Sequence, residues 1–373
     1  MIKLKNIYIY FLLTLFTAYT GYTFLWTRFG LGVTLGIQYL FLFIVLVGLV
    51  LYLTKDSKCR NSWSNWLVLL WVTQLFAFFI GESNATTQLK EATFVLLIPA
   101  PLIAIDYSTK KIKLFFVVIA TISITMFFVT KSWLRLTGEA SYGGGYMVLV
   151  ALPTFLYFFR NKGVFLQLSI IIVLFFLVLT SMKRGDILAA ILGLIVFFFV
   201  KFKGIDGFNF SKLVLLAVTV LIGYLSFRYL LDTNELFDTR FQQTLEGHTS
   251  NRDIIYSELW NSFTDAPIGV QLFGGGFDAT LNIIGDRAHS DLLEVLTCEG
   301  VLGLLIYLGA YFSLFLHTCR RTDTTEKAIL SLILAIWTVK MIFSMFIYSQ
   351  PTIILFALAA YILNKDINKK YEY

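Results

Sequence analysis

Apolar residues occupy most of this chain in long stretches, separated by short polar segments. A transmembrane helix needs about 20 mostly apolar residues. Twelve stretches approach or exceed that length, at residues 6–27, 31–53, 63–80, 90–106, 112–130, 143–159, 164–182, 186–201, 212–231, 289–316, 327–347 and 351–364. The fourth contains Pro99 and Pro101, which predict a kink, and the last begins at Pro351, a residue favoured at helix starts. The pattern predicts an all-α polytopic integral membrane protein with about 12 transmembrane helices, forming a single domain over residues 1–373.

One long segment, residues 232–288, breaks this apolar pattern between the predicted ninth and tenth helices. A long irregular segment in an otherwise compact chain is usually functional or disordered. Nine acidic residues and three arginines occupy it. That balance does not suit a general anion-binding surface, but it suits a site for one anionic group and several sugar hydroxyls. The alternative for each acidic residue is that it only keeps the loop soluble.

Basic residues predict how the chain is oriented in the membrane. Most Lys and Arg residues fall in segments that share one side of the bilayer, and such residues accumulate on the cytoplasmic side. An even number of helices then places both termini in the cytoplasm and residues 232–288 outside, which is the periplasm of a Gram-negative cell. The composition is 58% hydrophobic, so the net charge of +7 reflects membrane topology better than a nucleic-acid partner.

Cations that depart from this distribution are candidate functional residues. Lys183 and Arg184 occupy a tight outer turn, TSMKRGD, which does not need two adjacent cations for its shape. Lys340 lies inside the eleventh apolar stretch, and an ionisable residue within a span is by default a functional hypothesis. The alternatives for Lys340 are a snorkelling lysine or a structural pair with Glu294 or Glu299.

Arginine and histidine at the outer face suggest a specific chemistry. Arginine binds phosphate oxygens through paired N–H bonds and stays charged at every relevant pH. Arg252, in SNRDIIYSELW, together with Lys183 and Arg184, suits a lipid-linked pyrophosphate, whose growing charge as a leaving group these cations would stabilise. His289 lies where the polar segment meets the tenth helix and is a candidate general base for a sugar hydroxyl. An interfacial or capping histidine is the alternative.

Glycine and cysteine positions add little chemistry. The clusters Gly143–Gly145 and Gly274–Gly276 match neither a P-loop nor a dinucleotide-binding fingerprint. Both fit tight turns, and the second would allow the backbone to approach a ligand. No cysteine lies in residues 232–288 and no Cys/His cluster occurs, so we expect neither a disulfide framework there nor a metal site.

Three segments, in order along the chain, resemble the superfamily of O-antigen polymerases and O-antigen ligases. TSMKRGDILAA is similar to the family's short outer turn with its arginine. NRDIIYSELWNSFTDAPIGVQLFGGGF is similar to its pattern of arginine, tryptophan and a proline–glycine loop, and AHSDLLEVLTCEGVLGLLIYL to its histidine-led helix start. The resemblance covers about residues 170–320. This chain departs from the pattern in the extra Lys183, in Asp186 after the glycine, and in Ser290, where asparagine is common.

The resemblance implies a GT-C-like fold with one large periplasmic loop, and a metal-independent membrane glycosyltransferase without a cofactor. It implies the bacterial inner membrane, with the active site facing the periplasm. Carried over residue by residue, it places Arg184 and Arg252 on undecaprenyl pyrophosphate and His289 on acceptor activation. We therefore expect these three residues to be catalytic. Four further cations are expected to bind substrate: Lys183, Arg240, Arg287 and Lys340.

The expected function is that of a surface-polysaccharide polymerase, which transfers the growing glycan from undecaprenyl pyrophosphate to the next lipid-linked repeat unit. An O-antigen ligase that transfers the glycan to lipid A–core remains open, because the motifs do not separate the two. A flippase or exporter of the lipid-linked glycan is the alternative from another class. The expected partners are the undecaprenyl-pyrophosphate-linked oligosaccharide, the lipid bilayer, a chain-length regulator and a flippase, and no nucleic acid.

Overall fold

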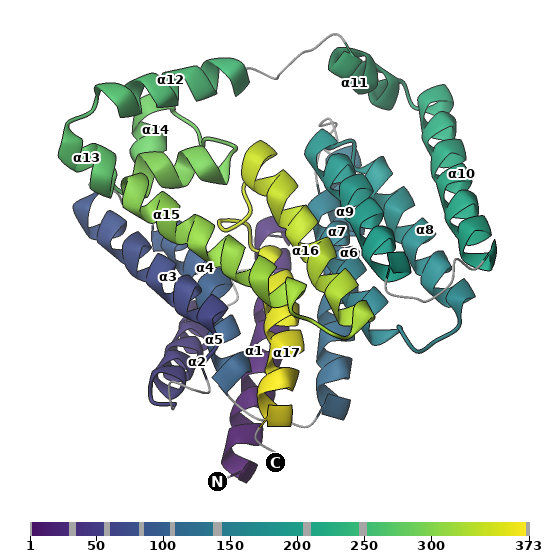
Figure 1. The fold of residues 1–373 in the computed structure, drawn as a ribbon. Helices are drawn as coiled ribbons and strands as arrows, with labels where there is room; N and C mark the ends of the chain where they lie inside the picture. Colours follow the sequence, from purple (N-terminus) through teal and green to yellow (C-terminus); the bar gives the residue numbers. More distant parts are fainter. Residues whose placement is uncertain are drawn as a thin grey trace. The chain divides into compact units, whose positions relative to one another are not determined.

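A computed structural model describes residues 2–29, 35–55, 60–81, 86–104, 109–136, 144–203, 210–245 and 252–370. The regular structure in these ranges is helical, without a strand (Figure 1). Its helices are α1 (Ile2–Phe29), α2 (Leu35–Leu53), α3 (Ser62–Ile80), α4 (Thr86–Leu97), α5 (Pro99–Ala104), α6 (Thr109–Leu136), α7 (Gly145–Phe158), α8 (Val164–Thr180), α9 (Arg184–Lys203), α10 (Phe210–Thr233), α11 (Glu235–Leu245), α12 (Arg252–Asp265), α13 (Ile268–Phe273), α14 (Ala279–Ile284), α15 (Asp291–Cys319), α16 (Thr324–Phe343) and α17 (Thr352–Lys370).

The predicted all-α membrane architecture is confirmed, and each predicted apolar stretch coincides with a helix or a pair of helices. The fourth stretch is divided at Ile98 into α4 and α5, because Pro99 cannot continue the helical hydrogen bonds. Five helical segments within the described ranges are long and apolar enough to cross a membrane: Gly36–Leu53, Ser62–Ile80, Ile112–Lys131, Arg184–Lys203 and Asp291–Cys319. The number of spans, about 12, stays a prediction.

Residues 232–288 are not the irregular segment that the sequence suggested. Most of their described part folds into the four helices α11 to α14 (Figure 1). These helices are short, and helices shorter than about 12–15 residues are marginal in isolation, so contacts with other elements must stabilise them. α12, for example, packs against α14 and α15. Because such stabilisation is non-local, the hydrophobic pattern did not reveal these helices.

The chain divides into two compact units, each assembled from separate segments. The first consists of Met1–Ile119, Arg252–Arg320 and Lys340–Tyr373, and the second of Ala120–Asn251 and Arg321–Val339. Lys183 and Arg184 therefore belong to the second unit, whereas Arg252, Arg287, His289 and Lys340 belong to the first. The expectation of one domain over residues 1–373 stays a prediction.

Packing within the first unit positions the start of α15. This helix packs along α3, and α17 packs against α4 and α5 (Figure 1). Aromatic side chains fill the spaces between helices: the ring of Phe94 lies 4.8 Å from that of Tyr19 and 4.6 Å from that of Phe41, and Trp63 meets Phe356 edge to face at 5.3 Å. Such pairs add to the stabilisation from buried apolar area.

The glycine run in LFGGGF donates hydrogen bonds to α15 where this helix is kinked. Gly300 has φ 71° and ψ −171°, which interrupts the helix. Carbonyls that precede such an interruption need other donors. The N–H groups of Gly275 and Gly276 donate to the carbonyls of Thr297 and Cys298, at 2.9 and 3.1 Å. The expected close approach of this glycine backbone is therefore an approach to the protein's own helix.

We expect Gly300→Ala to destabilise the protein strongly. A β-carbon there would lie 2.4 Å from the carbonyl oxygen of Leu272, and the left-handed φ adds strain of about 1–3 kcal/mol. Thermal unfolding in detergent checks this, with Gly269→Ala as the control because no atom lies within 4 Å of a β-carbon at that position. Equal unfolding temperatures for the two variants would contradict the prediction.

Candidate functional site

Three consecutive carbonyls at the end of α16 receive hydrogen bonds from side chains of other elements. The last carbonyls of a helix have no intrahelical partner. The bonds run from Ser290 to Met341 at 3.1 Å, from Tyr256 to Ile342 at 3.1 Å and from Arg252 to Phe343 at 2.8 Å. They fix the start of α12 and the start of α15 on the same helix end, so two motifs that are distant in sequence meet within the first unit.

His289 directly precedes Ser290, which makes one of these three bonds, and its backbone is strained. Its φ is 52°, in the left-handed region that few non-glycine residues adopt. The Tyr256 hydroxyl lies 3.1 Å from the Ile342 carbonyl at the end of α16 and 3.3 Å from the His289 carbonyl, so its single proton is shared between these two acceptors. The imidazole side chain remains 43% exposed. Strain that persists in a folded structure is a reason to propose a function.

Asp286 is a functional candidate that sequence reasoning missed. Its Oδ2 atom lies 3.6 Å from Nε2 of His289, while its Oδ1 atom accepts the backbone N–H of Arg287 at 2.7 Å. A carboxylate this close to an imidazole ring can orient it. The signal in the sequence is the spacing of three residues between Asp286 and His289, which does not distinguish this acid from the others in the segment.

Arg287 is engaged by two carboxylates of the protein. It contacts Glu294 at 2.7 Å and Asp278 at 3.0 Å. Burial lowers the pKa of Arg287, but the two carboxylates outweigh this effect and raise the pKa above its ordinary value. Glu294 also accepts the backbone N–H of Ala288 at 2.9 Å, so this pair holds the residues just before His289. The expected contact between Arg287 and substrate stays a prediction.

Glu294→Ala is expected to destabilise the first unit. Removing one partner of a buried ion pair leaves the other charge uncompensated, at a cost of about 3–5 kcal/mol, and the Glu294 side chain is only 1% exposed. Thermal unfolding of the solubilised protein measures the effect. Glu258→Ala, at an exposed position on α12, is the control. If Glu294→Ala lowered the unfolding temperature no more than this control, the structural role of Glu294 would be refuted.

Lys340 is buried, with 2% of its surface exposed, one residue before the bonded carbonyls at the end of α16. A snorkelling lysine exposes its ammonium group, so the burial argues against that alternative. Of the two carboxylates considered as its partners, Glu294 contacts Arg287, and Glu299 accepts hydrogen bonds from Thr73 at 2.6 Å and from a tyrosine hydroxyl at 3.0 Å. The expected substrate-binding role of Lys340 stays a prediction.

In the second unit, Lys183 and Arg184 lie at the N-terminus of α9. Met182 before them has a left-handed φ of 56°, and the Lys183 carbonyl accepts an early helical bond from Asp186 at 3.0 Å. The N–H groups and the dipole of a helix N-terminus favour an anion, and two adjacent cations add to that preference. Among the residues whose backbone is described, Met182 and His289 are the non-glycine positions with positive φ.

Neighbouring elements of the second unit hold this turn in place. Ser181 donates to a carbonyl of α8 at 2.6 Å. A β-carbon at Gly145 would lie 2.3 Å from Oγ of Ser181, so glycine is needed for α7 to begin this close to the turn. The Lys131 ammonium donates to the Thr180 carbonyl. Lys131 is thus a third cation beside the turn, and its place at the end of an apolar stretch gave no indication of this contact.

The remaining expectations concern Arg240 and metal binding. Arg240 lies in α11, but the placement of its side chain is outside the described part of the chain, so its role stays a prediction. Within the ranges that the structure describes, no three His, Cys, Asp or Glu side chains are arranged to hold a metal ion.

Comparison with known proteins links this site to a family. Residues 168–308 match the family model described as O-antigen ligase. No curated protein matches the chain. The matched segment contains every expected site residue except Lys340, namely Lys183, Arg184, Arg240, Arg252, Arg287 and His289. Residues 168–308 are therefore similar to the O-antigen ligase family, which supports the expected resemblance to the superfamily of O-antigen ligases and polymerases.

Proposed function

We propose that this protein is a membrane glycosyltransferase that polymerises a surface polysaccharide. It transfers the growing glycan from undecaprenyl pyrophosphate to the next lipid-linked repeat unit. The observation that carries the proposal is the setting of His289: an exposed imidazole beside Asp286, in strained backbone, tied through Tyr256 to the helix end that also holds Arg252. A base and a cation held on one helix end suit glycosyl transfer from a pyrophosphate donor.

The proposed reaction assigns one task to each group. A hydroxyl oxygen of the acceptor attacks the anomeric carbon of the donor glycan while His289 takes the hydroxyl proton. The bond between that carbon and the pyrophosphate breaks, and the pyrophosphate leaves with the electron pair. Arg252, together with Lys183 and Arg184 at the start of α9, offsets the charge of the leaving group. Since both substrates are lipid-linked, holding them in one membrane site contributes through proximity.

The proposal includes a location and partners. The protein is a multi-pass protein of the bacterial inner membrane, with both termini in the cytoplasm and residues 232–288 in the periplasm. The distribution of Lys and Arg along the sequence supports this orientation. A flippase would deliver the lipid-linked repeat to the periplasmic side, and a chain-length regulator would limit the polymer.

An O-antigen ligase is the second candidate, because the matching family model carries that description. The donor and the roles of the arginines and of His289 would be the same, but the acceptor would be lipid A–core. The two enzymes therefore differ in the acceptor, and the acceptor is the variable that an experiment must change.

Reconstitution of the purified protein in vesicles tests these functions. With lipid-linked repeat units alone, a polymerase produces a ladder of longer lipid-linked glycans. A ligase forms a glycan–lipid A product when lipid A–core is added. Without lipid A–core, a ligase produces no ladder. A flippase moves repeat units across the bilayer without lengthening them. Absence of any glycan transfer in the presence of both acceptors would refute the proposed activity.

We expect EDTA to leave polymer growth unchanged, because His289 and the cations supply the functions that a metal ion would otherwise supply. The same assay measures the rate before and after chelation, and a metal-dependent glycosyltransferase in parallel vesicles verifies that chelation is complete. Loss of growth that a single divalent ion restores would contradict the metal-free mechanism.

A further inference from the structure

The short helix α13 in the first unit has an apolar surface without a charged residue. Four of its six residues are large, apolar and exposed: Ile268, Val270, Leu272 and Phe273. Ile268 is the most exposed of them, at 73%. An exposed apolar patch marks a surface that contacts a protein or a membrane.

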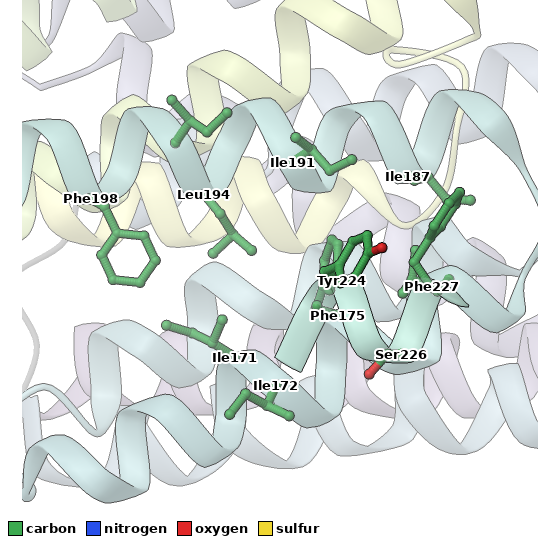
Figure 2. A pocket seen from close by; sticks show the side chains of 13 residues that line it. Ile171, Ile172, Phe175, Ile187, Ile191, Leu194, Phe198, Tyr224, Ser226 and Phe227 are labelled. Atoms are coloured by element: carbon green, nitrogen blue, oxygen red, sulfur yellow. The ribbon is translucent and has the colours of Figure 1, made fainter. Parts of the chain in front are cut away.

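Exposed apolar side chains on the spanning helices already have a partner. In the second unit, Ile187 and Ile191 of α9 and Phe227 of α10 line an apolar groove (Figure 2). Because α9 is long and apolar enough to cross a membrane, bilayer hydrocarbon accounts for that surface. The same explanation does not extend to α13, because it belongs to residues 232–288, which the sequence predicts to lie outside the membrane.

Two candidate spans, α3 and α15, adjoin α13 and the glycine run that follows it. α13 packs against α15, and beyond the glycine run the N–H of Phe277 donates to the Ala77 carbonyl of α3 at 3.0 Å (Figure 1). Close to these contacts in the sequence, Phe79 and Ile80 of α3 and Leu302 of α15 are exposed. In a bilayer these side chains face lipid. α13 therefore joins the lipid-facing surface of the two spans at one end.

The kink in α15 indicates the level of α13 in the bilayer. A β-carbon on Gly300 would lie 2.4 Å from the carbonyl oxygen of Leu272, so α13 ends against the kink. From Gly300 to Cys319, the last residue of α15, the helix is roughly 28 Å long at 1.5 Å per residue. The hydrocarbon layer is about 30 Å thick. With Cys319 at one boundary, before Arg320 and Arg321, α13 lies at the opposite boundary.

Polar groups at the turn into α13 are satisfied within the protein. The Gln271 side chain donates to the carbonyls of Thr264 and Ala266, at 2.9 and 3.0 Å. These carbonyls lie at the end of α12, where a helix leaves its carbonyls without intrahelical partners. Water would serve them in an aqueous turn, whereas lipid requires an internal donor. The single polar side chain of α13 supplies that donor.

We propose that α13 inserts its apolar face into the outer leaflet and anchors residues 252–288 to the membrane surface. The partner is phospholipid, because the surface is apolar, uncharged and contiguous with lipid-facing spans at the headgroup level. α12 remains in water, since several polar side chains on it are exposed: Glu258, Asn261, Thr264 and Asp265. The inference goes beyond the proposed glycosyl transfer, which requires no contact between α13 and lipid.

Spin labels on single cysteines test the location of α13 in phospholipid vesicles. Cys59 and Cys319 are first replaced by serine, while Cys298 is buried and stays. One label is then placed at Ile268→Cys or at Phe273→Cys. Collisions with oxygen report a hydrocarbon environment, and collisions with a water-soluble nickel chelate report an aqueous one.

Two reference positions calibrate these collisions. Leu305→Cys, at an exposed apolar position on α15, reports lipid, and Thr264→Cys, at an exposed position on α12, reports water. The labels on α13 should collide with the chelate about tenfold less often than the Thr264→Cys label, since hydrocarbon excludes a polar solute. They should also collide with oxygen more often than that label does.

A charged substitution provides a second readout. Phe273→Asp should draw α13 out of the leaflet, because a charge in the apolar layer is unfavourable. Chelate collisions of the Ile268→Cys label should then rise towards those of the water reference. Thr264→Asp, at a position already in water, should leave them unchanged. Val270→Asp serves in place of Phe273→Asp if the latter lowers the unfolding temperature.

The outcomes decide which partner covers α13. Equal chelate collisions for the labels on α13 and on α12 would place α13 in water and overturn the proposal. Low collisions with both reagents, together with dipolar broadening between labels, would show a second copy of the chain on this surface and would also overturn it. Labels shielded by lipid in a protein that transfers no glycan would support the anchor and refute only the proposed function.

Discussion

His289→Ala is expected to abolish polymer growth, with kcat lowered by about 10²–10⁴-fold, the contribution typical of a general base. The imidazole is exposed, lies 3.6 Å from Asp286, and belongs to a residue held at a φ of 52°. Without it, the acceptor hydroxyl would have to attack while still protonated. Lipid-linked single repeats should accumulate, and gel analysis of the lipid-linked glycans from cells that express the variant measures both effects.

A second substitution separates chemistry from backbone strain. Asparagine tolerates the left-handed region better than most residues but cannot act as a base near neutral pH. His289→Asn should therefore keep the wild-type unfolding temperature and lose as much activity as His289→Ala. Wild-type polymer length in either variant would refute the role of His289 as base. Asp286→Asn should give a smaller loss, because it removes only the group that orients the ring.

Arg252→Ala is expected to lower kcat by about 10²–10³-fold, the loss typical when one stabilising group of a transition state is removed. The Arg252 guanidinium has five N–H donors, and its bond to the carbonyl of Phe343 does not neutralise its charge. The charge is therefore held at the same helix end as His289. The vesicle assay with purified lipid-linked repeats measures kcat.

The control for Arg252 must separate its charge from its structural bond. Ser290→Ala removes a neutral bond to the same end of α16, the one to Met341, and should reduce activity only slightly. Arg252→Lys keeps the charge but loses the planar fork, so its activity should lie between the wild type and Arg252→Ala. If Ser290→Ala lost as much activity as Arg252→Ala, Arg252 would have only a structural role. Normal polymer that never reaches lipid A–core in Arg252→Ala cells would favour the ligase.

The positions of the long helices could be predicted from the sequence because their cause is local. An apolar stretch in a bilayer must satisfy its own backbone hydrogen bonds, and a helix does so within the stretch. The division of the fourth stretch before Pro99 has the same local origin, since proline removes a donor and blocks the preceding turn. Lys183 and Arg184 were also recognisable, because charge next to long apolar stretches stands out.

Arg287 shows what the sequence could not reveal. Its charge suggested substrate binding, which stays a prediction, but nothing in the linear pattern indicated that its guanidinium lies against Glu294 and Asp278. The helices α11 to α14 were missed because they are short, and their stability depends on contacts with other segments. The partner of an arginine is set by three-dimensional distances, which residue spacing does not specify outside a single helix.

The sequence by itself determined the helical architecture, the cations at the start of α9, and the candidates Arg252 and His289, because the length of an apolar stretch and the position of a charged residue beside it can be read from short segments. Only the tertiary structure decided that Arg252, Tyr256 and Ser290 converge on the end of α16, and that Asp286 accompanies His289. The physical reason is that unpaired carbonyls at a helix end accept whatever donors the packing brings within about 3 Å. That packing depends on the whole first unit.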